Sequence, residues 1–367
     1  MLGGGSRISL HLRECSHLHL LHHYQHHHHH SFNLAPSTTA ISSPHNRHQL
    51  QRMVSYTSIQ SKSAGEIPIM SSDCFSQHED DDHQLPPQEF SPVAGGIVAL
   101  GKFDALHIGH RELAIQASKV GTPYILSFVG MAEVLGWESR PPVVAKCDRH
   151  RVLASWAQYC GNVTPSEFQV EFSSVRHLSP QQFVEKLSKE LKVCGVVAGE
   201  NYRFGYKAAG DASDLVTLCE EYGLEAYIIN AVMDKKQDLR NMDLTDIKNK
   251  GQVSSTRIRQ VLAVGDMKYV SELLGRRHRL MLKLKGHKVV TTSSNQQRFS
   301  APRSCFLNLP PKTGFYKNCS LFLGNENPLT CSVVIDSTYI HLEMDGLDIS
   351  SYIGSPDFQL VGVEFGD

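Results

Sequence analysis

The chain has 367 residues and a formal net charge of −1, and 41% of its residues are hydrophobic and 20% charged. This length suits about two domains of roughly 150 residues each, and the composition argues against a wholly disordered chain. Near-neutral charge gives no global attraction to nucleic acid or anionic membrane, and no apolar run reaches about 18 residues, so neither partner is expected. The nine cysteines form no CxxC pair, which argues against a disulfide framework or a structural zinc site.

The first 92 residues have the composition of a targeting segment rather than of a folded domain. Up to Gly65 they contain one acidic residue, Glu14, while basic residues and serines recur. Such a basic, serine-rich and acid-poor segment is typical of organellar transit peptides. The histidine run 26–30 lacks oxygen or sulfur partners at fixed spacing, so we interpret it as compositional drift rather than as a metal site. We expect residues 1–92 to be a transit peptide and disordered linker.

After residue 92, short apolar runs alternate with helical patterns. The expected strands cover 95–100, 123–128, 193–198 and 224–232. The expected helices cover 108–120, 148–160, a segment starting at Ser179–Pro180, 212–222, a segment capped by Ser255, and 267–274. Strands separated by helices predict right-handed crossovers and a mostly parallel sheet, whose ligands lie beyond the carboxyl ends of its strands. The loops after Leu100, Phe128 and Ala198 are therefore the expected binding region.

Beyond Arg279 the helical period disappears. Short apolar stretches alternate there with Gly, Pro and Asn turns, a pattern that predicts a small all-β module of about 85 residues. The stretches cover 280–284, 305–309, 320–323, 331–335, 339–344 and 360–365.

The most informative motif is residues 101–110, GKFDALHIGH, which leads from a strand end into a helix start. A helix N-terminus offers unpaired N–H groups and partial positive charge to phosphate oxygens. His107 and His110 share one face of the first turn, where two imidazoles can donate hydrogen bonds to an oxygen whose charge grows during reaction. Gly109 lets a nucleotide approach the backbone closely. The alternative is a pair of histidines that only cap the helix.

A second motif, SSTRIR at 254–259, opens a late helix. Ser255 and Thr256 can cap that helix and bind phosphate, and Arg257 supplies a permanently charged fork. An ordinary capped helix with solvated arginines is the alternative, but the joint presence of both motifs favours a nucleotide site. The sequence contains neither a GxxxxGK[ST] nor a GxGxxG string, which argues against a P-loop kinase and a dinucleotide oxidoreductase.

A third motif, GENYRFG at 199–205 followed by Gly210–Asp211, leaves the expected third strand. Its aromatic faces suit a planar ring, and Asn201 offers an amide donor and acceptor to the polar edge of such a ring. Alternatively, Tyr202 and Phe204 only plug the end of the sheet.

Together the three motifs closely resemble the FMN adenylyltransferase module of FAD synthetases, particularly the prokaryotic type and its plant chloroplast relatives. The resemblance covers about residues 93–280 and includes the LLGR string at 273–276. Lys102 and Ala105 depart from the family, which usually has Asn and Gly there. Residues 127–132, SFVGMA, replace the family's acidic, proline-rich string.

The resemblance implies an α/β architecture: a Rossmann-like nucleotidylyltransferase domain at 93–279, then a small degenerate β-barrel-like domain at 280–367 that is similar to riboflavin kinase. The Gly-Phe-Pro-Thr-x-Asn signature of that kinase is missing, and the corresponding region, 291–298, reads TTSSNQQR. We therefore expect no riboflavin kinase activity.

The resemblance also implies the reaction ATP + FMN giving FAD and pyrophosphate, with Mg²⁺ as cofactor, in the chloroplast or, as second choice, the mitochondrion. His107, His110 and Arg257 are the expected catalytic residues, and no metal ligand is assigned. The expected ATP-binding residues are Gly101, Phe103, Asp104, His107, Gly109, His110, Ser255, Thr256 and Arg257. The expected FMN-binding residues are Phe128, Asn201, Arg203 and Asp211.

Three alternatives stay open. The acceptor is another phosphate compound, such as a pantetheine phosphate or nicotinamide mononucleotide; the chain binds flavin or nucleotide without catalysis; or it also carries the kinase activity.

Overall fold

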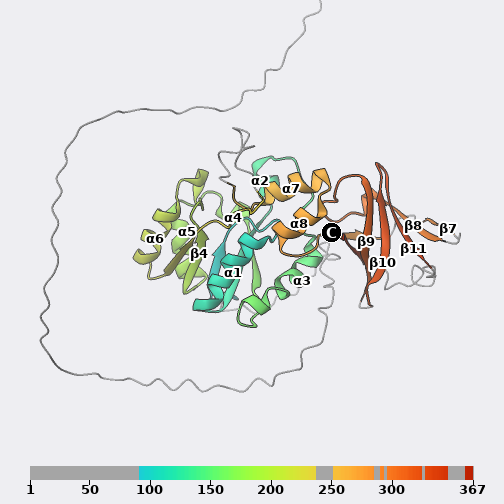
Figure 1. The fold of residues 1–367 in the computed structure, drawn as a ribbon. Helices are drawn as coiled ribbons and strands as arrows, with labels where there is room; N and C mark the ends of the chain where they lie inside the picture. The colour runs from blue at the N-terminus through green and yellow to red at the C-terminus, as the bar shows by residue number, and fades with distance from the viewer. Residues whose placement is uncertain are drawn as a thin grey trace, which may run out of the picture. The chain divides into compact units, whose positions relative to one another are not determined.

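The computed structural model describes residues 91–236, 251–284, 290–292, 296–324, 327–345 and 360–366. The expected transit peptide and linker, apart from Ser91 and Pro92, lie outside the described residues. Within those ranges, no helix has the length and apolar character needed to span a membrane. The described elements form a parallel sheet with helices, followed by an antiparallel sheet (Figure 1).

The first sheet has five strands, all of them parallel. They are β1 (Ile97–Leu100), β2 (Pro123–Val129), β3 (Ser166–Glu171), β4 (Gly195–Gly199) and β5 (Glu225–Ile229). The strand order is β3-β2-β1-β4-β5, so β1 lies at the centre, and all four of its residues are buried. The chain order reverses between β1 and β4, which makes their carboxyl ends the topological switch point. The expected Rossmann-like parallel sheet is confirmed.

Most of the expected helices are present with similar bounds. The helices are α1 (Ile108–Val120), α2 (Met131–Leu135), α3 (Arg149–Ala154), α4 (Phe172–Val175), α5 (Pro180–Glu185), α6 (Ala212–Glu221), α7 (Ser255–Val264) and α8 (Met267–Leu274). The helix expected at 148–160 is wrong in length, because α3 ends at Ala154 and a 3₁₀ turn follows at Ala157–Tyr159. The Ser155 hydroxyl donates to the Val152 carbonyl at 2.6 Å, a local bond that competes with helix continuation.

The cap expected for α7 is displaced by one residue. Ser254, not Ser255, has the extended backbone of an N-cap, and its Oγ accepts from the Arg257 N–H at 3.2 Å. Ser255 is the first helical residue, and its buried Oγ has no hydrogen-bond partner among the described residues. Two adjacent serines offer the same capping chemistry, and only the backbone geometry decides between them.

The second sheet confirms the expected β module. Its strands are β6 (Arg279–Lys283), β7 (Val290–Thr292), β8 (Gln296–Pro302), β9 (Gly314–Leu323), β10 (Leu329–Ile335), β11 (Tyr339–Asp345) and β12 (Leu360–Glu364). They pair antiparallel in the order β6-β12-β9-β10-β11-β8-β7. The strand expected at 305–309 is wrong: a 3₁₀ turn occupies Arg303–Cys305, and Phe306 makes an isolated bridge to Leu282.

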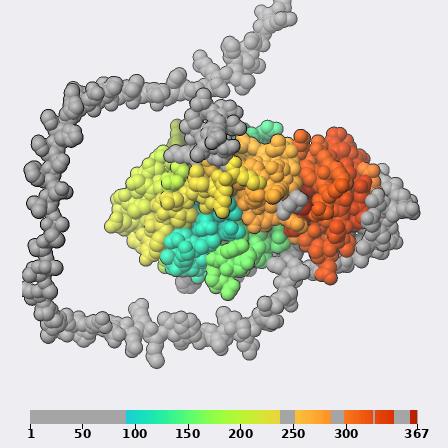
Figure 2. Space-filling view, in the orientation of Figure 1, coloured from blue at the N-terminus to red at the C-terminus, as the bar shows by residue number. Residues whose placement is uncertain are grey.

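One hydrophobic cluster joins α7 and α8 to the second sheet. It contains Leu262 and Leu274 from the two helices together with Leu280, Leu321 and Phe365 from the β module. In the space-filling view the orange surface of the helices lies against the red surface of the sheet (Figure 2). The β module therefore shares its core with the end of the first module instead of having a separate one.

A buried histidine lies beside this shared core and couples stability to pH. His278 is 2% exposed, and its Nε2 lies 2.9 Å from the Leu309 carbonyl oxygen. Burial, as the largest cause, lowers the pKa of His278 from 6.5 to about 4. Below pH 6.5 this histidine binds a proton in the unfolded chain, whereas in the folded chain it does so only near pH 4. The free energy of unfolding is therefore highest above pH 6.5 and decreases as the pH falls toward 4.

We predict that the pH dependence of unfolding is weaker in His278→Gln, since glutamine keeps a donor near Leu309 but does not titrate. Between pH 7 and pH 5, His278 should cost the wild-type chain about 2 kcal/mol of unfolding free energy. Urea unfolding of both proteins at the two pH values measures the difference. Identical pH dependence in the two proteins would contradict a buried neutral imidazole.

Candidate active site

A strained turn connects β1 to α1. Leu106, which is fully buried, has a φ of 46°, a left-handed conformation that is unfavourable for a non-glycine residue. The guanidinium of Arg276 holds this turn by donating to the carbonyls of Leu106 at 2.6 Å and Ala105 at 3.0 Å. Arg276 belongs to the LLGR string, which the sequence marked as a family feature without assigning it a role. It is a functional candidate that sequence reasoning missed.

The histidine pair lies at the start of α1. His107 is the N-cap of the helix, and its Nδ1 accepts the backbone N–H of His110 at 3.2 Å. Because an amide N–H can only donate, Nδ1 of His107 is unprotonated and Nε2 carries the hydrogen. The two rings stack with their centroids 3.7 Å apart and their planes inclined by 15°. His107 therefore caps α1, which is the part of the alternative interpretation that the geometry bears out. Its Nε2–H is still available to a ligand.

Both imidazoles are neutral at physiological pH. The side chains are only 5% and 8% exposed, and burial, followed by the charge of Arg276, lowers the pKa of His107 to about 3. Burial, followed by His107 and then Arg149 and Arg276, lowers the pKa of His110 well below 6.5. Nδ1 of His110 is buried without a hydrogen-bond partner in the part of the chain that the structure describes. Such an unsatisfied polar atom is uncommon in native proteins and marks a place for a ligand or a water molecule.

A cleft of about 400 Å³ opens at the carboxyl ends of β1 and β4, beside the N-termini of α1 and α7. Its lining includes Gly101, His107, Gly109, His110, Asn201, Ser255 and Thr256. Two helix N-termini, together with the Ser255 hydroxyl, which has no partner in the described ranges, place partial positive charge and donors around one space. This arrangement suits a polyphosphate.

Gly109 has a local reason to be glycine. A Cβ at this position would lie 3.1 Å from Cε1 and 3.2 Å from Nδ1 of His107. A side chain there would press against the capping imidazole, so the glycine preserves the stack of the two histidines.

A larger cleft, of about 920 Å³, adjoins the first and shares Gly101 and Lys102 with it. Its lining also includes Phe103, Asp104, Phe128, Trp137, Arg149 and Arg259. Arg149 donates to the Phe103 carbonyl at 2.7 Å and forms an ion pair with Glu167 at 2.7 Å. No sequence motif marked Arg149 or Trp137, and only their place in the fold brings them to the cleft.

The two arginines of the SSTRIR motif point to different places. Arg257 donates to the buried carboxylate of Asp234 at 2.8 Å and is not part of the lining of either cleft. Arg259 lines the larger cleft and donates to Oδ2 of Asp104 at 2.8 Å. Residues two apart on a helix differ by about 200° in direction, so the two side chains leave the helix on nearly opposite sides. The structure thus brings Ser255 and Thr256, but not Arg257, to the cleft of the histidine pair.

The structure brings together three of the four expected FMN residues, and Phe128 lies apart from them. Phe128 lines the larger cleft, whereas Asn201 lines the smaller one. Arg203 and Asp211 lie in an exposed hollow next to the smaller cleft, and Asn201 lines this hollow as well. They form an ion pair there at 3.5 Å, and Asp211 caps α6. Phe204 is buried in the core of the parallel sheet, as the alternative interpretation of that motif expected, whereas Tyr202 lines the smaller cleft.

The fold and site define a nucleotide-binding α/β enzyme in which a histidine pair and two helix N-termini face one cleft. Comparison with known proteins identifies the family. A family model described as "FAD synthetase" matches residues 91–241, and one described as "FAD synthetase 1/2, C-terminal domain" matches residues 277–367. Two proteins of Arabidopsis thaliana, named FAD synthetase 2, chloroplastic, and FAD synthetase 1, chloroplastic, are 56% and 55% identical over the whole of both chains. The chain belongs to the FAD synthetase family, and the expected enzyme class is confirmed.

More distant relatives match part of the chain. A bifunctional riboflavin kinase/FMN adenylyltransferase of Listeria monocytogenes is 28% identical over 53% of this chain and 57% of its own length. A solved structure titled as a macrolide-efflux protein from Streptococcus pneumoniae has a TM-score of 0.55 and 20% identity, covering 74% of this chain and 92% of that one. That likeness shows the fold alone.

We predict that Arg276→Lys lowers the rate of FAD synthesis by about tenfold or more, because one ammonium cannot replace a fork that holds two carbonyls of a strained turn. Arg277→Lys, at the exposed neighbouring residue, is the matched control and should keep the wild-type rate. Steady-state rates of the two variants make the comparison. An Arg276→Lys enzyme with wild-type turnover would show that the turn holds its shape without this fork.

Proposed function

We propose that this protein transfers AMP from ATP to FMN, giving FAD and pyrophosphate. The observation that carries the proposal is the buried, neutral histidine pair of α1, which faces the same cleft as Ser255 and Thr256 of α7. The names of the Arabidopsis relatives support FAD as the product, and the name of the Listeria relative supports FMN as the acceptor.

In this reaction an oxygen of the FMN phosphate attacks the α-phosphorus of ATP in line, and the bond to the bridging oxygen breaks as pyrophosphate leaves. The attacking phosphate is already anionic at neutral pH, so no general base is needed. An imidazole with a pKa of about 3, as at His107, is too weak a base for that role and acts as a donor instead. Nε2–H of His107 and the ring of His110 would stabilise charge on the α-phosphate.

The β- and γ-phosphates would lie against the N-terminus of α7, where the Ser255 hydroxyl is unpartnered among the described residues. Arg257 stays the arginine predicted for this role, although it would have to leave Asp234 to reach the cleft. Arg259 is already beside the loop that follows β1, through its bond to Asp104. The geometry therefore favours Arg259 as the arginine that faces substrate.

The flavin would occupy the larger cleft. That cleft adjoins the smaller one at Gly101 and Lys102, and Phe128 and Trp137 offer aromatic faces to a planar ring. Of the expected FMN residues, Phe128 lies there, while the roles of Asn201, Arg203 and Asp211 stay predictions.

Mg²⁺ would accompany ATP, held mainly by its phosphates and by water. No group of three or more His, Cys, Asp or Glu side chains suited to a metal occurs within the described residues. We also propose a chloroplast location, since both Arabidopsis relatives are named chloroplastic and the N-terminal segment is basic and serine-rich.

The absence of riboflavin kinase activity is part of the proposal. It rests on the missing signature in the sequence, and residues 293–295 of the corresponding region lie outside the described part of the chain.

We predict that His110→Ala lowers kcat by about a hundredfold or more, because the lost donor acts on charge that develops in the transition state. His150→Ala, at an exposed histidine of α3, is the control and should leave kcat unchanged. Pyrophosphate release with ATP and FMN measures both rates. Unchanged turnover in His110→Ala would remove this residue from the mechanism.

A product assay tests the proposed function itself. The full chain is incubated with ATP, Mg²⁺ and, separately, FMN, riboflavin, nicotinamide mononucleotide or phosphopantetheine. We expect FAD and pyrophosphate with FMN, no FMN from riboflavin, and little pyrophosphate with the other acceptors. Preference for another acceptor would refute the FMN assignment, FMN formation would reveal the kinase, and FMN binding without pyrophosphate would indicate a non-catalytic protein.

A further inference from the structure

A short segment lies between the β module and the active-site loop. Residues Pro141, Pro142 and Val143, here called the 141–143 strap, precede α3 and form hydrogen bonds on two sides. Val143 is fully buried, in the cluster that joins α7, α8 and the second sheet. The strap is therefore a fixed part of the structure.

On one side the strap contacts the residues beside the two clefts. The N–H of Val143 donates to Oδ1 of Asp104 at 3.0 Å, and Arg259 donates to the carbonyl of Pro141 at 2.9 Å. Oδ2 of Asp104 accepts from the same guanidinium at 2.8 Å. Asp104 and Arg259 thus share one hydrogen-bonded ring with the strap, at the edge of the larger cleft.

On the other side the β module holds the strap. Nδ2 of Asn308 donates to the Val143 carbonyl at 3.0 Å, and the Leu309 N–H donates to the Pro142 carbonyl at 2.8 Å. Val143 therefore links Asn308 to Asp104: its carbonyl accepts a hydrogen bond from Asn308, and its N–H donates one to Asp104.

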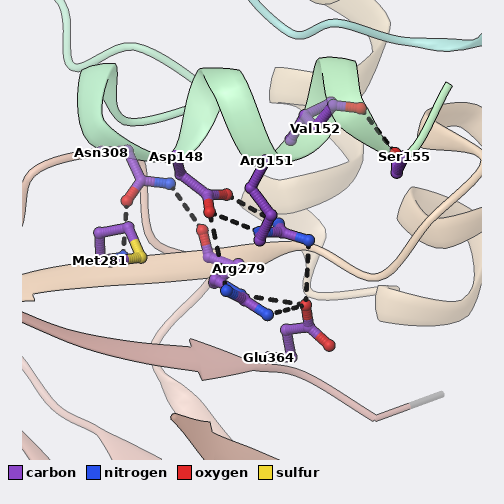
Figure 3. A network of polar contacts seen from close by, with 8 residues as sticks. All are labelled: Asp148, Arg151, Val152, Ser155, Arg279, Met281, Asn308 and Glu364. Atoms are coloured by element: carbon purple, nitrogen blue, oxygen red, sulfur yellow. Dashed lines mark hydrogen bonds and ion pairs between the residues drawn. The ribbon is translucent and has the colours of Figure 1, made fainter. Parts of the chain in front are cut away.

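Asn308 is built for this contact. It is 0% exposed, its Nδ2 also donates to the Arg279 carbonyl at 2.9 Å, and its Oδ1 accepts the Met281 N–H at 2.8 Å. Both amide hydrogens and the amide oxygen are used, so the side chain has one orientation. Figure 3 shows Asn308 against Met281 and Arg279 of β6.

An ion-pair network reinforces the same junction. Arg279 donates to Glu364 of β12 at 2.8 Å and lies 3.7 Å from Asp148, which precedes α3 (Figure 3). Asp148 in turn accepts two bonds from Arg151 of α3, at 2.6 and 2.8 Å. Strand β6 cannot move relative to α3 without separating Arg279 from Asp148, two charged side chains that form an ion pair in a buried place.

We propose that Asn308 is a positioning residue for adenylyl transfer, and that the β module supports the active site through the 141–143 strap. It acts through Val143 on Asp104 and, through Asp104, on Arg259. The inference rests on the proposed function, because Asp104 and Arg259 matter to the rate only if substrate binds in the cleft that they line. The module would then have a role in catalysis that requires no kinase chemistry of its own.

The test is Asn308→Asp in the full chain. The substitution keeps the size and the acceptor for Met281, but it removes both donors and places a carboxylate oxygen against two carbonyls. We expect kcat/KM for ATP to fall by about tenfold or more. Asn308→Ser can donate one hydrogen bond and should fold more readily than Asn308→Asp. Its kcat/KM for ATP should lie between the values of the wild type and Asn308→Asp. Val333→Ala, at a buried residue of β10 outside the strap, controls for destabilisation and should keep wild-type kcat/KM below its melting range.

A double-mutant cycle separates positioning from general stability. If Asn308 acts through Asp104, adding Asn308→Asp to Asp104→Ala should change kcat/KM by less than about twofold. Two results would overturn the inference. In the first, both Asn308 variants have lower unfolding midpoints but wild-type kcat/KM. In the second, Asn308→Asp lowers kcat/KM by the same factor in the Asp104→Ala background as in the wild-type chain. A wild-type protein that forms no FAD in the same assay would instead refute the proposed function.

Discussion

The hydrogen bond from the His110 backbone N–H to Nδ1 of His107 is the interaction on which the active site depends. It satisfies one of the free N–H groups of α1, fixes the tautomer of His107 and brings the two rings into a stack. Burial keeps both imidazoles neutral, so positive charge at the cleft comes from Lys102 and the helix N-termini rather than from histidine. A neutral donor of fixed orientation needs no reorganisation when charge builds on a phosphate.

Much of the fold was predictable from hydrophobic pattern, and the failures have physical causes. The central strands and α1 are signalled by apolar runs and helical spacing. The strand β3 (Ser166–Glu171) gave no such signal, because it is an edge strand whose side chains are largely accessible. The bounds of α3 were set by the local bond of Ser155, and the hydrophobic core shared by α7, α8 and the second sheet depends on long-range packing that no local pattern encodes.

The site was predictable where one turn of helix carries the chemistry. His107, Gly109 and His110 lie together because they are neighbours in sequence at the end of a central strand. Arg257 was favoured as a charged fork that follows Ser255 and Thr256, but helical geometry turns it toward Asp234. The contribution of Arg276 comes from more than 100 residues further along the chain, and only tertiary structure brings it to the strained turn.

The protonation state of the histidine pair is the claim to test most directly. Nitrogen-15 NMR of imidazole groups, with His107→Gln and His110→Gln variants for assignment, reports tautomer and charge as a function of pH. We predict that His107 is the neutral Nε2–H tautomer throughout pH 5 to 8 and that neither ring titrates in this range. Titration of either imidazole near the ordinary pKa of 6.5 would contradict it.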